Sequence, residues 1–570
     1  MKSMLNHIIF SIIIPTLLLT SCEKGLELAP EDKYSEATFF KTADQFKLFA
    51  NQFYNGLPDC NAAYNRELYS DVVTNVGAAN TVSNGSYFPT PTSSLWENSY
   101  ITIRNTTYLI QKSASADATL KAQISVFEGE ARFFRAMAYF NLLKDFGGVP
   151  IIDKVLDLSD DNLLYGPRNS EAEVSDYIIK DLDEAILELP TESSISGSDK
   201  GRVSKGAALA LEARVALFEG TWLKFNNQDG SALLDKAIDA SNQVINSGEY
   251  QLFDRRDVLG DSSYRYFFIL DKVQSNSASL TKADQKEYIF VNRFDNDIRP
   301  ATGVSGNYFV SPTRKLADMF LCADGLPIDV SPLFQGKQTV GSEYLNRDPR
   351  MTNDLEVPFK TFWAFYPPEY NRTWTNPDAG GVVYDVNFGR TTSTGYYPMK
   401  FQAEIAAPLG TDYPVIRYAE VLLTNAEALF EKNGSISDAD LDRTINLLRA
   451  RVGVASLTNE LVTAHGLDMR TEIRRERTVE LFLEGFRFDD LRRWHTAETE
   501  MPEALEGVKW TGTQYATDPR WSSLNFPVDP DGYLIVEPAS DRKFVSKHYL
   551  FPLPTRQLLL NPALIQNPGW

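Results

Sequence analysis

Apolar residues recur at helical spacing through much of the first 250 residues and again over residues 413–495. Between residues 128 and 146 they form a one-sided stripe, which stops at Gly147-Gly148 with Pro150 beyond, an arrangement that typically ends a helix. The same reasoning predicts further helices, joined by short turns, at residues 172–189, 203–222, 233–245, 414–431 and 438–451. The pattern therefore predicts a chain that is mostly α-helical.

Two regions interrupt the helical pattern. Residues 251–412 and 496–548 are rich in Gly, Pro, Asn and aromatic residues and hold only short strand-like runs, such as residues 288–291. Long irregular stretches in a compact protein are usually functional loops or binding surfaces. The helical pairs alternate small and bulky residues and resemble degenerate tetratricopeptide repeats. We therefore expect a mostly α fold: a tetratricopeptide-like helical-pair scaffold with a loop-rich, irregular ligand-binding face and a few short strands.

The N-terminus has the pattern of a secretion signal. Residues 8–19 are apolar except for Ser11 and Thr16, a run too short to span a bilayer comfortably. The run ends in Leu19-Thr20-Ser21-Cys22, which resembles the cleavage site of bacterial lipoproteins. We predict that residues 1–21 are a signal peptide and that residues 22–36 form a tether with a lipid on Cys22. The alternative is an ordinary signal peptide followed by a chance cysteine.

The charge balance is strongly acidic, with 56 basic and 76 acidic residues among 570, so the formal net charge is 56 − 76 = −20. This excess argues against nucleic-acid binding, because phosphate contacts rely on Lys and Arg. It also gives no attraction to anionic lipid, so an acyl group would have to hold the chain on a membrane. Cys60 and Cys322 are the only cysteines after Cys22, and their spacing does not show whether they pair.

Catalytic and metal-binding motifs are absent from the sequence. There is no H-E-x-x-H, C-x-x-C, G-x-S-x-G or G-x-x-x-x-G-K-[ST] pattern. Acidic residues are so numerous that no pair of carboxylates singles itself out for glycoside hydrolysis, which depends on their separation. We therefore predict no catalytic residues, no metal site and no cofactor.

Residues 474–493 are dense in Arg, Glu and Asp and could suggest a catalytic or phosphate-binding cluster. Their spacing favours a helix surface instead, because Asp489 and Arg493 lie four residues apart, as paired charges on a helix do. On this interpretation Val479, Phe482 and Phe486 belong to the buried side, together with Leu483.

Aromatic residues are concentrated between Phe362 and Tyr397, where ten occur in 36 residues of a Pro-, Gly- and Asn-rich segment. Rings exposed on loops suit sugars, whose apolar C–H faces pack on them while nearby amides and carboxylates bind the hydroxyls. The alternative is that the rings fill the core beneath a long loop, and we expect about half of them to do so. The predicted ligand-binding aromatic residues are Trp363, Tyr366, Tyr370 and Trp374, with Asn371, Arg372, Asn376 and Asp378 placed to bind hydroxyl groups.

Several short motifs, spread in order along the whole chain, resemble those of the SusD/RagB family. The clearest lie at residues 130–136, 473–477, 484–487 and 490–494, and near the C-terminus. In sequence they are Glu130-Ala131-Arg132-Phe133-Phe134-Arg135-Ala136, Ile473-Arg474-Arg475-Glu476-Arg477, Glu484-Gly485-Phe486-Arg487, Asp490-Leu491-Arg492-Arg493-Trp494 and Phe551-Pro552-Leu553-Pro554.

The resemblance implies an outer-membrane lipoprotein that faces the cell exterior and catalyses nothing. It implies a SusC-like TonB-dependent transporter as partner and an oligosaccharide, or occasionally a peptide, as ligand. It also implies an N-terminal helical region over residues 37–250 and a C-terminal region over residues 251–570, together in one compact unit. Within the latter we expect loop-rich residues 251–412, helical residues 413–495 and loop-rich residues 496–570.

Family members commonly place ligand-contacting side chains in the loop near residues 75–95 and shortly before the Pro312-Thr313 motif. By position this implies Asn84, Tyr87, Asn307 and Tyr308 as further ligand-binding residues, whereas Tyr396 and Tyr397 fall in a family motif and are expected to be structural. Taken together, the sequence predicts a non-catalytic, glycan-binding surface lipoprotein. A peptide-binding member of the same family and a surface glycoside hydrolase are the alternatives.

Overall fold

The computed structural model describes residues 39–157, 159–301, 310–358, 361–362, 382–383, 386, 388–389, 392–403 and 409–570, with backbone only at 361–362 and 382–383. The predicted site residues at positions 307, 308, 363, 366, 370 and 374 and the predicted lipid attachment at Cys22 lie outside these residues.

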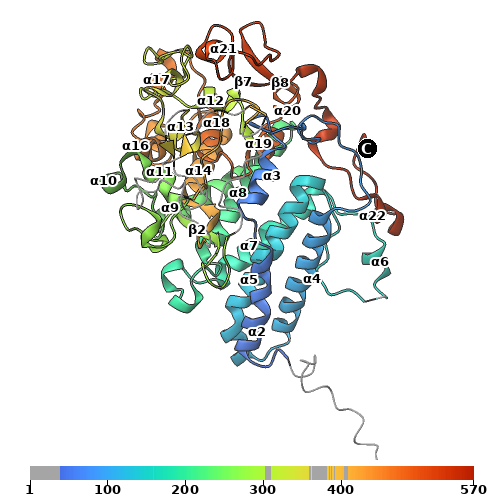
Figure 1. The fold of residues 1–570 in the computed structure, drawn as a ribbon. Coiled ribbons are helices and arrows are strands. Elements are labelled where there is room, and N and C mark those ends of the chain that lie inside the picture. The colour runs from blue at the N-terminus through green and yellow to red at the C-terminus, as the bar shows by residue number, and fades with distance from the viewer. Residues whose placement is uncertain are drawn as a thin grey trace, which may run out of the picture.

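The N-terminal half is built from long helices that pack in chain order. After α2 (Ala43–Ala50) and α3 (Cys60–Glu67), helix α4 (Ser94–Ala114) packs on α5 (Ala118–Phe146), α5 on α7 (Glu171–Glu188), α7 on α8 (Lys205–Phe225) and α8 on α9 (Ser231–Asn246) (Figure 1). The backbone N–H groups that would be left without partners at the first turns are satisfied by capping side chains, which are Ser93, Asp117, Ser170 and Ser204. The predicted scaffold of helical pairs is confirmed.

The C-terminal half contains one long helix and many short ones. Helix α14 (Tyr418–Asn433) packs on α8 and α9 and on α18 (Met469–Glu480), so it joins the two halves of the chain. The shorter helices of this half are α12 (Arg314–Met319), α13 (Pro349–Asp354), α15 (Asp438–Asp442), α16 (Ile445–Val452), α17 (Asn459–Ala464), α19 (Arg487–Arg493), α20 (Ala497–Glu500), α21 (Gln514–Thr517) and α22 (Thr555–Leu560). Three further short helices precede them in the chain: α6 (Asp161–Leu164), α10 (Arg256–Leu259) and α11 (Ser263–Phe267).

Strands occur as antiparallel pairs, and four such pairs lie within the described part of the chain. The pairs are β1 (Val73–Asn75) with β3 (Val310–Pro312), β2 (Tyr288–Asn292) with β6 (Tyr413–Arg417), β4 (Thr361–Phe362) with β5 (Val382–Val383), and β7 (Leu505–Lys509) with β8 (Tyr533–Glu537). All four pairs are short, and two of them, β1/β3 and β2/β6, join segments more than 120 residues apart, so these two fasten distant parts of the chain together.

Two predicted helices differ from the structure at their ends. The segment predicted as one helix over 414–431 begins as strand β6, because Pro414, Ile416 and Arg417 pair with β2 before the helix starts at Tyr418. The helix predicted over 438–451 is broken into α15 and α16 at Arg443 and Thr444. In the first of these places a contact with a distant strand outweighs the local periodicity. In the second place the backbone of Thr444 leaves the helical conformation, with φ −131° and ψ −98°.

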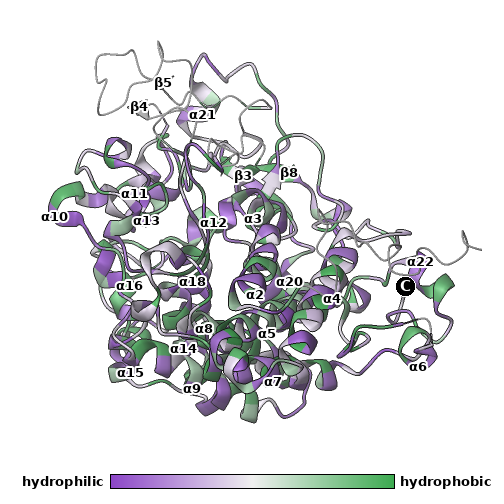
Figure 2. Cartoon of the chain, turned by 90° about the horizontal axis from the view of Figure 1, so that it is seen from below, coloured by the Kyte–Doolittle hydropathy of each residue, from purple (hydrophilic) through white to green (hydrophobic). Residues whose placement is uncertain are grey.

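The apolar core runs through the helical scaffold, and Figure 2 shows hydrophobic residues gathered where α5 and α8 lie. Phe133, Phe134 and Phe290 pack edge-on at ring-centroid distances of 5.1–6.1 Å, an arrangement aromatic pairs prefer. Tyr396 and Tyr397 are buried in this core, which confirms that these two rings are structural.

The charged stretch 474–493 does not form a helix surface, and that part of the prediction is wrong, whereas the predicted burial of Val479, Phe482 and Leu483 is confirmed. Helix α18 ends at Glu480, and the chain then turns through Leu483 and Gly485, which have φ values of 58° and 81°. The break directs the charged side chains of both flanking helices into the protein. Arg477, Arg487, Arg492 and Arg493 are buried, as are Glu476, Glu480 and Asp490.

Glu480 is the centre of this buried network. Its carboxylate accepts hydrogen bonds from Arg417 at 2.7 Å, from Arg451 at 2.6 and 2.7 Å and from Arg350 at 2.9 Å. Although burial alone would raise the pKa of Glu480, these guanidinium groups hold it well below its usual range. The arginines come from α13, β6 and α16, so the network ties distant segments together and has a structural role.

Cys60 and Cys322 are both buried and unpaired with each other. None of the helices within the described residues combines the length and the apolar character that a membrane-spanning helix needs.

Candidate functional site

Two of the three predicted ligand-binding loops, residues 75–95 and 292–310, share one anchoring point, the β1/β3 strand pair. The loop that begins after Asn75 leaves from β1, and the segment before Val310 enters β3, with Asn75 opposite Val310 in the register. Their described ends therefore lie side by side although more than 200 residues separate them in sequence.

The chain that follows the third predicted loop, residues 360–380, returns to the same place at Ser393 and Thr394. The backbone N–H of Ser393 donates to Ser311 Oγ at 2.9 Å, and Ser393 Oγ donates to the carbonyl oxygen of Asn75 at 3.1 Å. Thr394 Oγ1 donates to the carbonyl oxygen of Pro312 at 2.5 Å. We call the β1/β3 pair together with Ser393 and Thr394 the loop junction.

The start of the third loop lies next to its end. The Glu356 N–H donates to the Tyr397 carbonyl oxygen at 2.9 Å, and Leu355 forms a bridge with Pro398. The loop thus leaves and re-enters the core beside buried residues, which gives a rigid base on which side chains from several loops can act together.

Asn84 and Tyr87 are the predicted site residues that the structure describes, and both contact the C-terminal segment. The Asn84 carbonyl oxygen accepts from the Lys543 N–H at 3.0 Å, and its side-chain Oδ1 accepts from the Ser86 N–H, which closes a turn. The Tyr87 ring lies 4.9 Å from that of Trp570 and 5.3 Å from that of Phe551. Asn84 therefore holds its loop in shape, while Tyr87 lies at a surface cleft.

That cleft lies between α4 and α5, and we call it the α4–α5 cleft. It has a volume of about 940 Å³ and is bounded by α3 and by the C-terminal segment at Phe551 and Pro552. Tyr87 and Phe88 line it at the end of the predicted 75–95 loop. Its size falls in the range of ligand-binding pockets.

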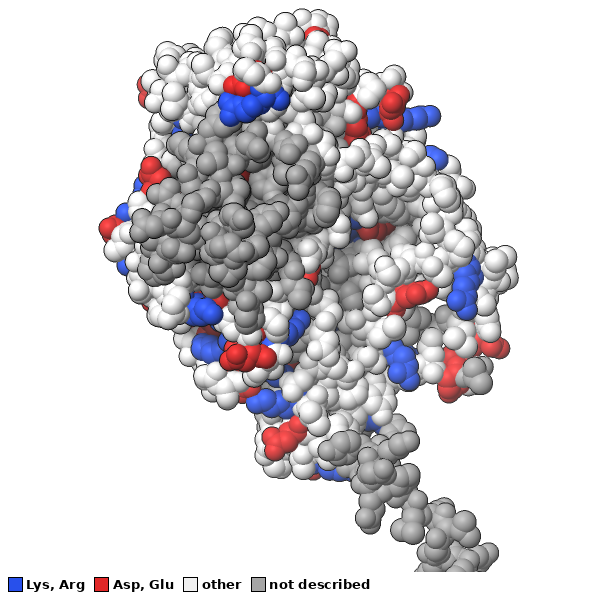
Figure 3. All heavy atoms as spheres, viewed as in Figure 1, with Lys and Arg blue, Asp and Glu red and all other residues white. Residues whose placement is uncertain are grey.

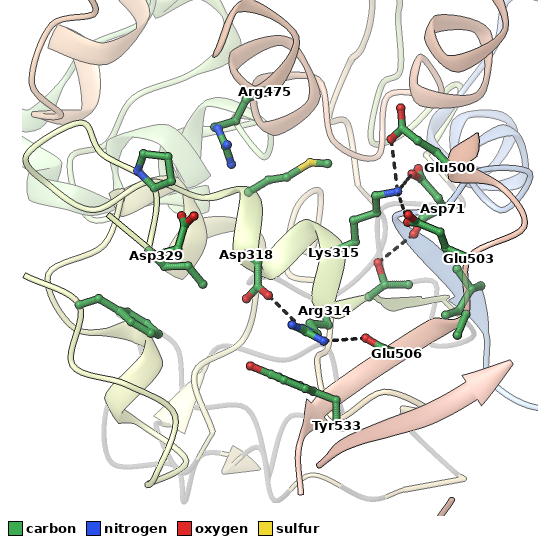
Figure 4. A pocket seen from close by; sticks show the side chains of 17 residues that line it. Asp71, Arg314, Lys315, Asp318, Asp329, Arg475, Glu500, Glu503, Glu506 and Tyr533 are labelled. Atoms are coloured by element: carbon green, nitrogen blue, oxygen red, sulfur yellow. Dashed lines mark hydrogen bonds and ion pairs between the residues drawn. The ribbon is translucent and has the colours of Figure 1, made fainter. Parts of the chain in front are cut away.

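A second pocket, of about 600 Å³, lies between α12, α20 and the β7/β8 pair, and its lining is strongly charged (Figure 4). Arg314 lies 3.4 Å from the centre of the Tyr533 ring and pairs with Asp318 at 3.1 Å and Glu506 at 2.8 Å. Its neighbour Lys315 carries a larger set of ion pairs, which join it to Asp71 at 2.8 Å, Glu503 at 2.9 Å and Glu500 at 3.2 Å.

The electrostatics of this charged pocket suit a cation more than a neutral sugar. Burial lowers the pKa of Lys315, but Asp71 and Glu500 outweigh that effect and hold it above its usual value. Burial raises the pKa of Glu506, although Arg314 opposes the change. The lining holds six carboxylates, which are Asp71, Asp318, Asp329, Glu500, Glu503 and Glu506, and three cations, which are Arg314, Lys315 and Arg475. Two cations outside the lining also pair with these carboxylates: Arg487 contacts Asp71 and Glu500, and Lys337 contacts Asp318. Six carboxylates against five cations leave one negative charge.

The sequence predicted neither the charged pocket nor the α4–α5 cleft, although it predicted one residue that lines the cleft, Tyr87. The charged pocket draws on segments near residues 71, 314–334, 475, 500–506 and 533, so no local motif marks it. The α4–α5 cleft had a readable signal, because Asn98, Thr102 and Asn105 follow one another at helical spacing and form an uncharged polar stripe on α4.

Two family models match the chain and together span most of it. The model described as the SusD family matches residues 269–570, and the model described as starch-binding associating with outer membrane matches residues 26–217. The first match alone covers more than half of the chain. The chain therefore belongs to the SusD family.

Individual relatives are distant but match over nearly their full length. SusD-like protein P38 of Formosa agariphila is 25% identical over 519 residues, which cover 87% of this chain and 93% of the relative. A SusD-like protein of Bacteroides ovatus is 23% identical over 604 residues, which cover 100% of this chain and 99% of the relative.

Solved structures have the same fold. A SusD-like protein from Bacteroides fragilis matches with a TM-score of 0.71 at 25% identity, covering 95% of this chain and 100% of that one. A SusD-like carbohydrate binding protein from the same species gives a TM-score of 0.72 at 22% identity, covering 93% of this chain and 100% of that one. A laminarin binding SusD-like protein gives 0.59 at 21% identity, covering 93% and 100%. These likenesses support the mostly helical, tetratricopeptide-like fold.

Proposed function

We propose that this protein is a non-catalytic glycan-binding lipoprotein of the outer membrane, which captures an oligosaccharide and delivers it to a SusC-like TonB-dependent transporter. Membership of the SusD family is the observation that carries the proposal. Support comes from structural neighbours named as carbohydrate binding and laminarin binding.

The ligand site in this proposal is the set of loops above the loop junction. Trp363, Tyr366, Tyr370 and Trp374 on one loop, and Asn307 and Tyr308 on another, would contact the sugar. On the third loop, Asn84 would hold the loop in shape and Tyr87 would face the α4–α5 cleft. The shared anchoring of the three loops supports this choice, because a sugar held by several loops needs their bases fixed relative to one another. Rings would pack on the C–H faces of the sugar, and amides would bind its hydroxyls.

Membrane attachment in this proposal depends on Cys22. Residues 1–21 would be removed, and the lipidated Cys22 would begin a tether that ends near residue 36, ahead of the unit formed by residues 37–250 and 251–570. The description of the family model over residues 26–217, with its association to the outer membrane, supports this location. An acyl anchor is needed because the net charge of −20 repels anionic lipid.

The experiment that tests this function is a titration of the full chain with a panel of neutral and anionic oligosaccharides, beside a panel of peptides. We expect at least one oligosaccharide to bind, and Trp363→Ala or Trp374→Ala to weaken it at least tenfold. Tyr165→Ala is the matched control, because that ring is 56% exposed at the end of α6. Unchanged affinity in both tryptophan variants would reject this placement of the site.

A peptide ligand is the second candidate function, and the charged pocket is the observation in its favour. Its surplus of carboxylates beside Met319, Ile328 and Phe334 would suit a cationic peptide with apolar side chains. Binding confined to the peptide panel, and weakened by Glu503→Gln, would establish this function instead. New reducing ends in the oligosaccharide samples would establish a glycoside hydrolase.

A further inference from the structure

The α4–α5 cleft is almost free of charge in a strongly acidic protein. Arg66 and Asp145 are the charged residues in its lining, and they pair with each other at 2.6 Å. Arg66 also contacts Asp489, so its charge is fully engaged inside the protein. Figure 3 shows a hollow on this side of the molecule, between the positions of α3 and α4 in Figure 1, and most atoms around it are uncharged.

Primary amides supply most of the polarity of the cleft. Asn65 on α3, Asn98 on α4 and Asn141 on α5 approach it from three helices, and within the described residues their side chains have no hydrogen-bond partner. An amide presents two donors and a carbonyl acceptor, so a set of free amides can bind hydroxyl groups, which also both donate and accept. Hydroxyl side chains at Thr102 and Ser94 add to this capacity.

Aromatic rings supply the apolar part of the cleft lining. Phe88 is 73% exposed at the edge of the cleft, although burial of a ring of this size is strongly favoured. The Tyr87 hydroxyl is buried and has no hydrogen-bond partner among the described residues. A buried hydroxyl without a partner is unfavourable, so a solvent molecule or ligand group that reaches it would gain a hydrogen bond.

The cleft also has the volume for more than one sugar ring, at about 940 Å³. Asn141 and Met137 on α5 line it together with a neighbouring hollow of about 490 Å³, which continues beneath α3 toward Tyr413 and Phe486. An extended ligand could therefore lie across α5 with hydroxyl groups facing amides and one C–H face against Phe88.

We propose that the α4–α5 cleft is a second binding site, separate from the loops above the loop junction, for an uncharged oligosaccharide. The proposal rests on the proposed glycan-binding function for the class of ligand. Free amides, an exposed ring and the absence of unpaired charge are the features that select a neutral polyhydroxylated molecule over a peptide or an anionic sugar.

The test separates the two sites by removing one of them. The full chain carrying Trp363→Ala and Trp374→Ala is titrated calorimetrically with neutral α- and β-linked glucan, mannan and xylan hexasaccharides. We expect at least one hexasaccharide to bind still, and the added substitutions Phe88→Ala, Asn98→Ala and Asn141→Ala to weaken that remaining binding at least tenfold. Asn162→Ala with Tyr165→Ala is the matched control, because both residues are exposed on α6.

Each outcome decides one claim. Loss of all hexasaccharide binding in the tryptophan variant, when the unaltered chain binds, would overturn the second site and leave the proposed function standing. Remaining binding that the cleft substitutions do not change would also overturn it. If no oligosaccharide binds to the unaltered chain, the proposed glycan-binding function itself fails. An unchanged thermal unfolding midpoint in the cleft variant excludes a general loss of structure as the cause.

Discussion

Buried carboxyl groups in this protein behave differently according to whether cations reach them. Glu480 is surrounded by Arg350, Arg417 and Arg451, which hold its pKa well below the usual range. Glu67 is equally buried, but its carboxylate accepts one backbone hydrogen bond, from Gly485 at 2.9 Å, and burial raises its pKa to about 8. The first group stabilises the folded protein at neutral pH and the second destabilises it.

Replacing Glu480 by Gln should destabilise the protein by about 3–5 kcal/mol at pH 7, because three buried guanidinium groups would lose their common counter-charge. The contribution of Glu480 is present above the ordinary carboxyl pKa and is lost as pH falls. Urea unfolding at pH 7 and pH 4 should therefore show a smaller loss on acidification for the variant. Glu503→Gln, whose side chain is 59% exposed, is the control and should change stability by less than about 1 kcal/mol. Equal effects of the two substitutions would contradict this account.

Glu67→Gln should have the opposite effect. A raised pKa means that ionisation of Glu67 costs the folded state free energy, and this cost grows as pH rises from about 4.5 toward 8. The variant should therefore match the unaltered protein near pH 4.5 and exceed its stability by a few kcal/mol at pH 8. Urea unfolding curves at the two pH values measure the difference. Identical pH dependence of both proteins would show that Glu67 is not the group responsible.

At the scale of helices and strands, the sequence predicted those elements that are determined by their own residues, through capping side chains and an apolar face. The helix predicted over 172–189 is α7, Glu171–Glu188, which has a capping box at Ser170 and one apolar face. The sequence did not predict the places where contacts with distant segments decide the local structure. Residues 414–417 follow a helical pattern, yet they pair with β2 from more than 120 residues away. The burial of the arginines in α18 and α19 was missed for the same reason, since some of their acidic partners, which include Asp71, Asp145 and Glu427, come from distant segments.

The candidate site also has parts that the sequence predicted and parts that only the structure shows. Aromatic density and family position selected the three loops, and the structure adds that their described ends share an anchor, a fact that depends on the Asn75–Val310 pairing and has no local signal. The charged pocket could not be predicted, because its side chains come from five separate segments. The α4–α5 cleft could have been suspected from Asn98, Thr102 and Asn105, but only the structure shows that α3 and α5 face that stripe.

The crossing of α8 and α9 gives a prediction about close helix packing. A Cβ atom added to Gly230, at the start of α9, would lie 2.0 Å from the carbonyl oxygen of Gly220 in α8, and backbone atoms cannot easily move aside. Gly230→Ala should therefore lower stability by about 1–3 kcal/mol through overpacking. Gly197→Ala is the control, because a Cβ there meets nothing within 4 Å. Thermal unfolding of both variants measures the effect, and equal midpoints would contradict the packing described.

The loop junction gives a prediction about ligand binding. Ser393→Ala removes the hydroxyl that bonds to the Asn75 carbonyl oxygen, a contribution of about 1 kcal/mol. We expect oligosaccharide binding at the loops to weaken several-fold with little change in the unfolding midpoint, because the loop bases would move independently. Thr92→Ala, at an exposed position, is the control. Titration calorimetry measures the change, and unaltered affinity would show that the junction does not position the loops.

At the scale of the whole molecule, ion pairs tie the N-terminal helices to the C-terminal half. Arg66 pairs with Asp489, and Asp145 pairs with Arg492. Both carboxylate oxygens of Asp71 accept hydrogen bonds from Arg487, each at 2.8 Å. Residues 37–250 expressed alone would leave these buried charges without partners and expose the faces of α8 and α9 that α14 covers. Limited proteolysis should degrade that fragment much faster than the full chain. Equal resistance would show that the N-terminal region folds independently.

The central claim is that this protein holds a sugar without altering it, and native mass spectrometry of the full chain with the oligosaccharide panel tests that claim most directly. We predict complexes whose mass equals that of the chain plus one or two intact oligosaccharides, unchanged after prolonged incubation. Shortened sugars in the complex or in solution, or complexes with peptides and none with sugars, would contradict the account.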